Sequence, residues 1–383
     1  MKQIRLWMLA AILSLCGNVT ASGQDASEQF TIVTLNVDGL PQKILMLKVN
    51  AEGPGEIGTA RIGKYLLKKD YDLVMMQEDF NYHGVLSVFL EDDYKMDTWS
   101  GDVGIEGHSI DFLHLQNHRF ECDGLMACWK NDLTVTSATR TAWTQSFGKF
   151  SHANDEMVTK GFRRYEVTLR DGTCIVVYNM HMDATLEEDE AENNAEKDHE
   201  ARMAQWAQLK ADVLEQLDDR PIIIAGDMNS IYGRDDVKGE FIDAINATGR
   251  ATVSDVWVEL TKNGIYPTAK TEAEAGDETL DKILYINPSE DINIQPVSIS
   301  IDREGYLYDG KALGDHWPVA ATFQVATRKA AVGISEQNFD GSEFSSSDFS
   351  IYTIDGRKVS NSLQRKGLYI ERNGENTKKR IVK

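Results

Sequence analysis

Residues 221–231, PIIIAGDMNSI, decide the fold that this sequence predicts. The run begins with β-branched and apolar residues that do not alternate with polar ones, which is typical of a strand buried on both faces. Asp227 and Asn229 follow, two positions apart, so on an extended chain both would project from the carboxyl end of the strand. Open α/β sheets bind ligands at that end. Considered alone, however, the segment is better explained as a strand followed by a polar turn.

Other apolar runs end in the same way, in polar residues with chemically useful side chains. These runs are FTIVTLNVD with Asn36 and Asp38, YDLVMMQE with Gln77 and Glu78, CIVVYNMHMD with His181 and Asp183, and ALGDHWPV with Asp315 and His316 just before the strand-like VAATFQV. So many strand ends carrying Asn, Asp, Glu and His are hard to explain as turns. They indicate one shared site.

Length and composition bound the class of protein. The chain has 383 residues, enough for one large α/β domain with an appendage or for two domains. Its hydrophobic fraction of 42% supplies a core and disfavours wholesale disorder. The net charge of −21 disfavours passive attraction to polyanions, although bound divalent cations would offset the local charge around a phosphate.

The amino-terminal segment predicts export. Lys2 and Arg5 precede the apolar run 6–16, and small residues follow, so we expect residues 1–23 to be a signal peptide. A lipid-modified Cys16 is disfavoured by the bulk of Leu15. The expected location is secreted or in the cell envelope, in a compartment that permits disulfides.

Cysteines and helical patterns give further expectations. Cys122 and Cys128 are close enough to pair, with two buried thiols as an equal alternative, and Cys174 is expected to be a packing residue. Helical spacing of apolar residues predicts helices over 58–69 and about 187–217. Residues 80–118, rich in His, Asp and Gly, are expected to form loops that border the site.

Composition changes near the carboxyl end. The Ser-rich, polar segment 328–347 is typical of a linker, and residues 348–383 alternate short β runs with Asp-Gly, Lys-Gly and Asn-Gly turns. We expect a small β-module of three or four strands there. The catalytic domain is therefore expected to span residues 24–327.

The polar residues at the strand ends predict a chemistry. Glu78, Asp38 and Asp315 are hard oxygen donors and Asn36 is a neutral one, a set that suits Mg²⁺, Mn²⁺ or Ca²⁺ better than zinc. A hard cation with His and Asp bases can hydrolyse a phosphate ester. In the strand-like TLDKILYIN, an aspartate (Asp281) is placed to orient a catalytic histidine through its ring N–H.

The ordered set of these motifs resembles the endonuclease/exonuclease/phosphatase (deoxyribonuclease I-like) superfamily over residues 30–326. The matching segments are LNVDGLP at 35–41, QEDF at 77–80, NMHMDA at 179–184, GDMN at 226–229, LDKILYI at 280–286 and GDHWPV at 314–319. Further segments resemble its secreted sphingomyelinase and phospholipase C-type branch. The resemblance implies a four-layer α/β sandwich of two mixed sheets flanked by helices, followed by the small β-module.

The resemblance also implies a metal site that holds Mg²⁺ or Mn²⁺. Glu78 would be the principal ligand, Asn36 and Asp38 would lie beside it, and Asp315 would help to bind the ion. Lys160, in TKGF, would offer a positive charge to the phosphate.

The catalytic groups are implied in the same way. Asp227 and His316 would activate the attacking water, and Asn229 would hold the phosphate or the water. His181 would contact the phosphate near the leaving group, and Asp281 would support His316.

The function expected from these residues is exported, metal-dependent hydrolysis of a phosphodiester, with a phospholipid or sphingolipid headgroup as the favoured substrate. Transient contact with a membrane surface is compatible with this, nucleic acid is less favoured, and no obligate protein partner is evident. Between Asp281 and Asp315 there is no adjacent pair of exposed aromatic residues, which similar haemolytic sphingomyelinases dip into lipid. The carboxy-terminal module resembles the sorting domains of exported Bacteroidota proteins. The alternatives are a secreted nuclease and a non-catalytic surface-binding protein on the same scaffold.

Overall fold

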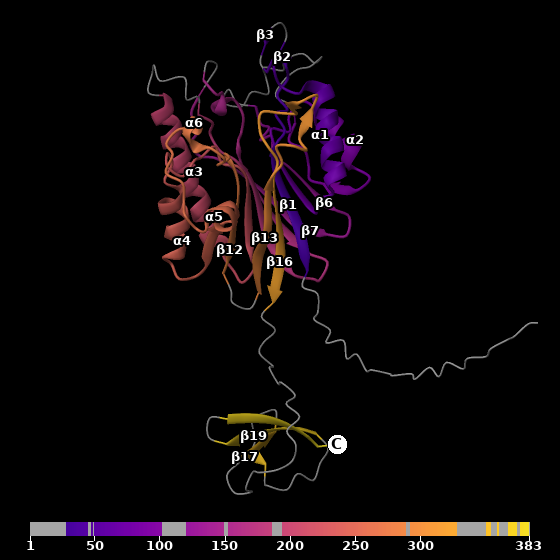
Figure 1. Ribbon diagram of the computed structural model, residues 1–383, viewed down its shortest axis with the longest axis vertical. Helices are drawn as coiled ribbons and strands as arrows, with labels where there is room; N and C mark the ends of the chain where they lie inside the picture. Colours follow the sequence, from indigo (N-terminus) through magenta and orange to yellow (C-terminus); the bar gives the residue numbers. More distant parts are fainter. Residues whose placement is uncertain are drawn as a thin grey trace, which may run out of the picture.

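The computed structural model describes most of the chain between residues 28 and 327 and four strands near the carboxyl end (Figure 1). The described residues are 28–44, 47–48, 50–101, 120–148, 152–185, 194–288, 292–327, 350–353, 358–359, 367–373 and 376–382. The predicted signal peptide and the predicted linker lie outside them, as do residues 102–119 of the expected loop region. Within the described part, no helix is both long enough and apolar enough to cross a bilayer.

Two mixed six-stranded sheets form the centre of the fold. The first sheet has, in spatial order, β13 (Ile292–Ile301), β16 (Val319–Thr327), β1 (Gln29–Asn36), β4 (Leu73–Gln77), β6 (Met126–Lys130) and β5 (Tyr94–Met96). The second has β11 (Thr252–Asp255), β12 (Asp281–Asn287), β10 (Ile222–Asp227), β9 (Cys174–His181), β8 (Gly161–Thr168) and β7 (Thr134–Ala142). Strand β1 runs parallel to β4, and β9 parallel to β10, while the other neighbours are antiparallel.

The alternation of side chains along each strand builds four layers. Ile32 of β1 packs between the sheets with Val177 of β9 and Ile223 of β10. The neighbouring Val33 points the other way, to a core shared with the helices that cover the first sheet. Tyr178 of β9 likewise faces a separate core on the outer side of the second sheet. Because both faces of the central strands are buried, their sequences are continuously apolar, and the predicted four-layer sandwich is confirmed.

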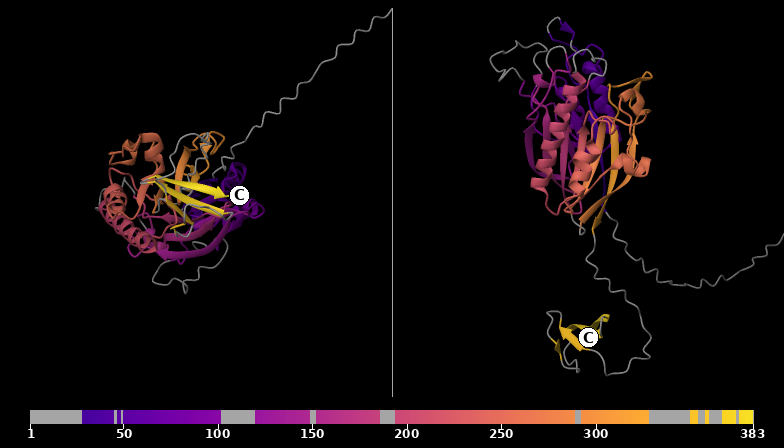
Figure 2. Two further views of the ribbon diagram at one scale, coloured as in Figure 1. Left: turned by 90° about the horizontal axis from the view of Figure 1, so that it is seen from below. Right: turned by 90° about the vertical axis from the view of Figure 1, so that its left-hand side faces the viewer.

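Helices cover the outer face of each sheet (Figure 1). α1 (Gly55–Lys69) and α2 (His83–Leu90) pack on the first sheet, and α3 (Asn194–Gln216) packs on the second, where it lies over the strands in the right-hand view of Figure 2. The shorter helical segments are α4 (Ala244–Asn246), α5 (Val256–Lys262), α6 (Glu272–Ala275), a 3₁₀ turn (Asp155–Met157) and a π-helical turn (Lys238–Asp243).

Two small hairpins and a separate sheet complete the described elements. The hairpins are β2 (Lys43–Ile44) with β3 (Leu47–Lys48) and β14 (Leu307–Tyr308) with β15 (Lys311–Ala312). Near the carboxyl end, a four-stranded antiparallel sheet has the order β18 (Lys358–Val359), β17 (Ser350–Thr353), β19 (Gly367–Asn373) and β20 (Asn376–Val382). Three or four short strands were expected there, and the sorting role of this segment stays a prediction.

Some local expectations were wrong. Part of the expected loop region is regular, because α2 and β5 lie within it: Leu86 and Leu90, four positions apart, bury one face of α2. Cys174 is exposed at the start of β9, so it is not a packing residue. Cys122 and Cys128 are free, buried thiols, which matches the alternative to a disulfide.

A buried polar bridge joins the two sheets directly beneath the edge that carries the polar residues. Asn179 of β9 accepts a hydrogen bond from Gln77 Nε2 of β4 at 2.7 Å. Its own Nδ2 donates to the carbonyl oxygens of Met76 and Met126, at 3.0 and 2.9 Å, at the last residue pair of the β4–β6 ladder. Thr34 of β1 donates to Gln77 Oε1 at 3.2 Å, so three strands of the first sheet are tied to the second.

We expect Asn179→Ala to lower the free energy of unfolding by about 3 kcal/mol, because it leaves two buried carbonyls and one buried amide short of a partner. Urea denaturation followed by tryptophan fluorescence measures this change. Asn131→Ala is the control, since that exposed asparagine makes one surface hydrogen bond at 3.2 Å and should change the free energy by less than about 0.5 kcal/mol. Equal effects of the two substitutions would contradict the bridging role.

Candidate active site

The ends of strands from both sheets meet at one edge of the sandwich. In the first sheet, Asn36 at the end of β1 pairs in register with Gln77 at the end of β4, immediately before Glu78. In the second sheet, Asp227 at the end of β10 lies opposite both His181 and Asp281. The register therefore places at this edge the side chains that the sequence singled out.

Two of the polar residues reach the site through tight turns and not along extended strands. β1 ends at Asn36 and β10 ends at Asp227, and the residues two positions later adopt left-handed backbone, with φ of 51° at Asp38 and 46° at Asn229. The side chain that ends each strand accepts the backbone N–H two residues on: Asp38 N donates to Asn36 Oδ1 and Asn229 N donates to Asp227 Oδ1, both at 3.0 Å. The two-residue spacing thus encodes a side-chain-capped turn.

Asp227 is the centre of the contacts. Its Oδ2 accepts a hydrogen bond from Asn36 Nδ2 at 3.1 Å across the two sheets. The same oxygen lies 3.3 Å from His181 Nε2 and 3.6 Å from His316 Nε2. Burial raises the pKa of Asp227 above that of an ordinary aspartate, while the positive charge of His316 opposes the change. This carboxylate is therefore more basic than an exposed one.

His316 is held between two carboxylates. It lies just before β16, which runs antiparallel to β1 and so begins at this edge. His316 Nδ1 donates to Asp281 Oδ2 at 2.7 Å, which fixes the ring and turns Nε2 toward Asp227. Burial alone would lower the pKa of His316, but the Asp281 and Asp227 carboxylates raise it well above its usual value.

His181 has the opposite electrostatic environment. Its Nε2 lies 3.0 Å from Lys160 Nζ, and burial together with the positive charge of Lys160 lowers the pKa of His181 well below its usual value. Burial alone would also lower the pKa of Lys160, but Asp155, its ion-pair partner, and Glu78 raise it. The site thus holds a neutral imidazole beside a charged ammonium group.

Three acidic residues, Asp38, Glu78 and Asp315, form an acidic group where the first sheet reaches this edge. Asn36 Nδ2 donates to Glu78 Oε1 at 3.1 Å, so this one amide links Glu78 with Asp227. Burial and the nearby Asp315 raise the pKa of Asp38 to about 7, and burial likewise raises that of Glu78 to about 7, with Asp315 adding to the effect. A bound cation would relieve this repulsion. The donor set therefore fits the hard divalent metal that the sequence predicts.

Comparison with known proteins now defines the family. A family model described as the endonuclease/exonuclease/phosphatase family matches residues 33–316. The chain belongs to this family. Its members are phosphodiesterases and phosphatases, and the superfamily depends on divalent metals. No curated protein matches the chain.

Solved structures of the endonuclease/exonuclease/phosphatase family share the fold. TDP2 from D. rerio, crystallised with a single-strand DNA product, is 17% identical, with 78% of this chain and 100% of that chain covered and a TM-score of 0.50. A Bacteroides vulgatus member is 15% identical over 78% and 100% of the two chains, with a TM-score of 0.49. Beta toxin from Staphylococcus aureus with bound magnesium ions is 18% identical over 77% and 99%, with a TM-score of 0.49. At 17% identity the likeness to TDP2 shows the fold alone.

Two candidate residues, Asp315 and Asn229, are less closely tied to the centre of the site than the others. Asp315 is exposed and acts on Asp38 and Glu78 through its charge. Asn229 Nδ2 donates a hydrogen bond to the carbonyl oxygen of Met182 at 2.9 Å. Among the described residues, Asp227, Asp281 and His316 are close enough together to hold one metal ion, since their ligand atoms lie within 4.8 Å of one another.

Several site residues of this family member were missed from the sequence. Asn50 donates from Nδ2 to Asp38 Oδ1, Asp155 pairs with Lys160, and the buried hydroxyl of Tyr306 lies near the acidic group without a hydrogen-bond partner among the described residues. Asp155 stands five residues before Lys160 in DEMVTK, which is the only sequence signal for that pair. Nothing in the sequence indicates the other two.

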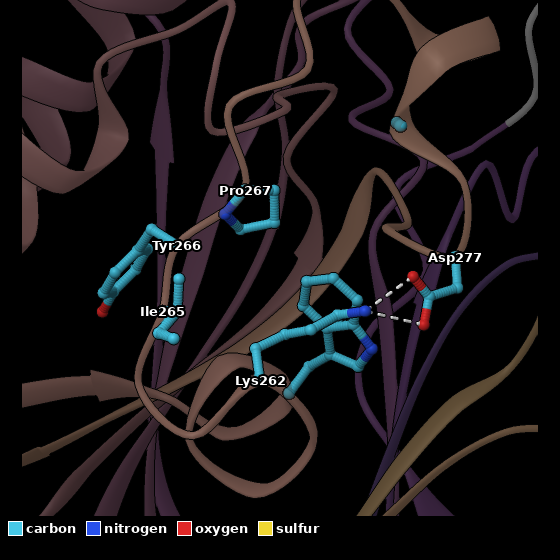
Figure 3. Close-up of a pocket in the computed structure, with 7 residues that line it drawn as sticks. Lys262, Ile265, Tyr266, Pro267 and Asp277 are labelled. Carbon is cyan, nitrogen blue, oxygen red and sulfur yellow. Dashed lines mark hydrogen bonds and ion pairs between the residues drawn. The ribbon is translucent and has the colours of Figure 1, made fainter.

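The surface also has a hollow of about 330 Å³, which is formed by residues outside the candidate active site (Figure 3). Trp257, Ile265, Tyr266 and Pro267 line it, and Lys262 Nζ pairs with both carboxylate oxygens of Asp277, at 2.8 and 3.0 Å. Its two charged residues neutralise each other, and none of its lining residues belongs to the candidate site. We therefore place the chemistry at the strand ends and not in this hollow.

The His316–Asp281 pair gives a direct prediction. In the metal-free protein, Asp281→Asn should lower the pKa of the His316 imidazole, because it removes the larger of the two carboxylate charges that raise it. Titration of the ring signals by NMR measures this change. The ring of His199, bonded to Asp235 at 2.7 Å, is the internal control, and its signals should be the same in the variant and the wild type. An unchanged His316 titration would show that Asp281 does not set its charge.

Proposed function

We propose that this family member is an exported, metal-dependent phosphodiesterase that hydrolyses the headgroup phosphodiester of a phospholipid or sphingolipid by in-line attack of water. The observation that carries the proposal is the convergence on Asp227 Oδ2 of Asn36 from one sheet and of His181 and His316 at 3.3 and 3.6 Å. A base, a histidine held by a carboxylate and an acidic metal-binding group then share one edge. Export rests on the sequence of residues 1–23 and is part of the proposal.

In this proposal Asp227 is the base. Its carboxylate is buried, more basic than usual, and fixed by the amide of Asn36, so it can take a proton from a water molecule that lies against the phosphorus. His316, whose pKa is raised by Asp281 and Asp227 although burial opposes this, carries a positive charge beside that carboxylate. The charge would stabilise the phosphoryl oxygens as negative charge develops.

Three other side chains would bind the phosphate. Lys160 keeps its charge and, with Nζ 3.0 Å from His181 Nε2, presents that charge at the same place as the imidazole. His181, whose Nε2 accepts from Lys160 Nζ, would contact the phosphate near the leaving group. Asn229 would hold the phosphate or the water with its amide oxygen or nitrogen, since its backbone is fixed by Asp227.

Glu78 would be the main metal ligand, with Asp38 and Asp315 completing the acidic set and Asn36 orienting Glu78. When bound there, Mg²⁺ or Mn²⁺ would neutralise phosphoryl oxygens and favour displacement. The raised pKa values of Asp38 and Glu78, caused first by burial, support a cation at this place.

The pairing of basic residues favours a small headgroup over a polynucleotide. Arg163 is bound to Asp97 and Asp123, and Arg164 to Glu166. Arg234 contacts Asp235 and Glu272, and Lys238 contacts Asp243. These basic residues lie near the motifs in sequence, as does Lys282 of LDKILYI, and each pairs with an acid of the same chain. Lys160 is paired as well, with Asp155, but its Nζ lies at the site, 3.0 Å from His181 Nε2. One cation at the site suits a single phosphodiester, whereas a nuclease groove needs a track of cations.

The hairpin β14–β15 bears on the physical state of the substrate. It lies between Asp281 and Asp315, the region in which haemolytic sphingomyelinases carry their exposed aromatic pair. Here Tyr306 is buried, and the exposed apolar residues are Leu307 and Tyr308, at 39% and 47%. Arg61 stacks over the Tyr308 ring at 3.3 Å. A single aromatic ring already covered by an arginine favours dispersed lipid over an intact bilayer.

A substrate panel tests the function. With Mg²⁺ present, the purified protein should hydrolyse detergent-dispersed sphingomyelin or phosphatidylcholine faster than plasmid DNA, and a chelator should abolish turnover. Asp227→Asn should lower the rate by on the order of 10²–10⁴, the usual range for a positioned base. Raising salt from about 50 to about 200 mM should change lipid turnover less than about threefold, whereas a polynucleotide held by several cations loses about 10³ in affinity.

The matched control is Asp218→Asn, which removes an acid that pairs with Arg220 on the surface and should leave turnover unchanged. Faster cleavage of DNA, with a rate that collapses as salt rises, would replace the lipid substrate with nucleic acid. Full activity in chelator would remove the metal from the mechanism. No turnover of any member of the panel would favour a binding protein on this scaffold.

A further inference from the structure

Glu78 has a backbone conformation that a glutamate rarely adopts. Its φ is 56°, in the left-handed region that non-glycine residues rarely adopt. Asp38 and Asn229 share this region, but each has its N–H accepted by a side chain two residues earlier. No such local cap holds Glu78 among the described residues. A strained residue persists only where its surroundings fix it.

The surroundings hold the carbonyl oxygen of Glu78, which accepts from Gly39 N at 3.1 Å and from Phe80 N at 2.8 Å, and they also hold the next residue, Asp79. Its backbone N–H donates to the carbonyl oxygen of Gly124 at 2.9 Å. Its carbonyl oxygen accepts from Trp99 Nε1 at 2.8 Å, and its carboxylate Oδ2 accepts from His83 Nδ1 at 2.6 Å. Asp79 is 1% exposed. The backbone N–H, the carbonyl oxygen and the carboxylate of Asp79 are therefore each hydrogen-bonded to a different part of the chain.

His83 and Trp99 reinforce each other. His83 is the first residue of α2, and Trp99 follows β5. Their rings stack with centroids 4.8 Å apart and planes 11° apart. The second oxygen of Asp79, Oδ1, is buried without a partner among the described residues, so the hydrogen bonding of this carboxylate depends on His83.

We propose that His83 and Trp99 are positioning residues that lock Asp79, and through it the left-handed backbone of Glu78, and so set the affinity of the metal site. The inference rests on the metal-binding role of Glu78 in the proposed function. The lock acts before any ligand arrives: it aims the Glu78 carboxylate at the strand edge, where Asn36 Nδ2 meets it at 3.1 Å. Truncation of His83 would leave a buried carboxylate without its donor, and the 78–79 backbone would rearrange to find another.

Metal binding in the absence of substrate measures the lock directly. The probe is Mn²⁺ alone, titrated into the full chain and followed by the EPR signal of the free ion. His83→Ala should weaken Mn²⁺ binding about tenfold or more, the usual cost of removing a group that orients metal ligands. Trp99→Phe keeps a stacked ring but loses the Nε1 donor, so it should weaken binding several-fold. His83→Asn places an amide donor near the position of Nδ1 and should restore most of the affinity.

His199→Ala is the matched control, because it breaks a histidine–aspartate pair of similar length, 2.7 Å against 2.6 Å, in which neither residue adjoins Glu78 in sequence. It should bind Mn²⁺ as the wild type does. A His83→Ala protein that binds Mn²⁺ within about twofold of the wild type, or that only loses thermal stability, would overturn the lock. If His83→Ala does not fold, Trp99→Phe decides by the same criterion. A wild type that binds no Mn²⁺, or binds it equally well as Glu78→Gln, would remove the metal role of Glu78 itself.

Discussion

The hydrogen bond from Gln77 to Asn179, at 2.7 Å, joins two sheets whose shared core is apolar. Apolar packing is nondirectional, so it holds the sheets together without fixing how far one slides along the other. A buried polar bridge has only one satisfied arrangement. Because Gln77 precedes Glu78 and Asn179 lies two residues before His181, this bridge fixes the proposed metal-binding side of the site against the proposed catalytic side.

Above the bridge, the site is held by two kinds of constraint. Asn36 and Asp227 each cap the turn that follows them, which is a local device that needs only two residues. Glu78 has no such cap: its carbonyl oxygen accepts from Gly39 N and Phe80 N, and its neighbour Asp79 is held by partners from separate parts of the first sheet and its helices. The strained residue at the site is thus also the one that relies most on tertiary structure, which is the pattern expected of a preorganised ligand.

The sequence predicted the fold well where chemistry and periodicity agreed. The apolar runs at 30–38 and 221–231 became central strands because burial on both faces demands continuous apolar residues. The candidate residues met because parallel strands end, and antiparallel strands begin, at one edge. The sequence could not show the partners of those residues: Asn50, Asp155 and the acids that pair with Arg163 come from distant segments. It also missed α2, whose mixture of Gly, Ser and β-branched residues has low helical propensity and whose helix is fixed by the packing of Leu86 and Leu90.

We propose that the cation lies at Glu78 and that Asp227 is the base, although among the described residues it is Asp227, Asp281 and His316 that have the mutual spacing of metal ligands. Anomalous diffraction from crystals grown with Mn²⁺ distinguishes the two arrangements. We predict a manganese peak within bonding distance of a Glu78 carboxylate oxygen, with His316 still bonded to Asp281 through Nδ1. A peak bonded to His316 and Asp281, with Glu78 uninvolved, would contradict the division of the site into a metal-binding side and a catalytic side.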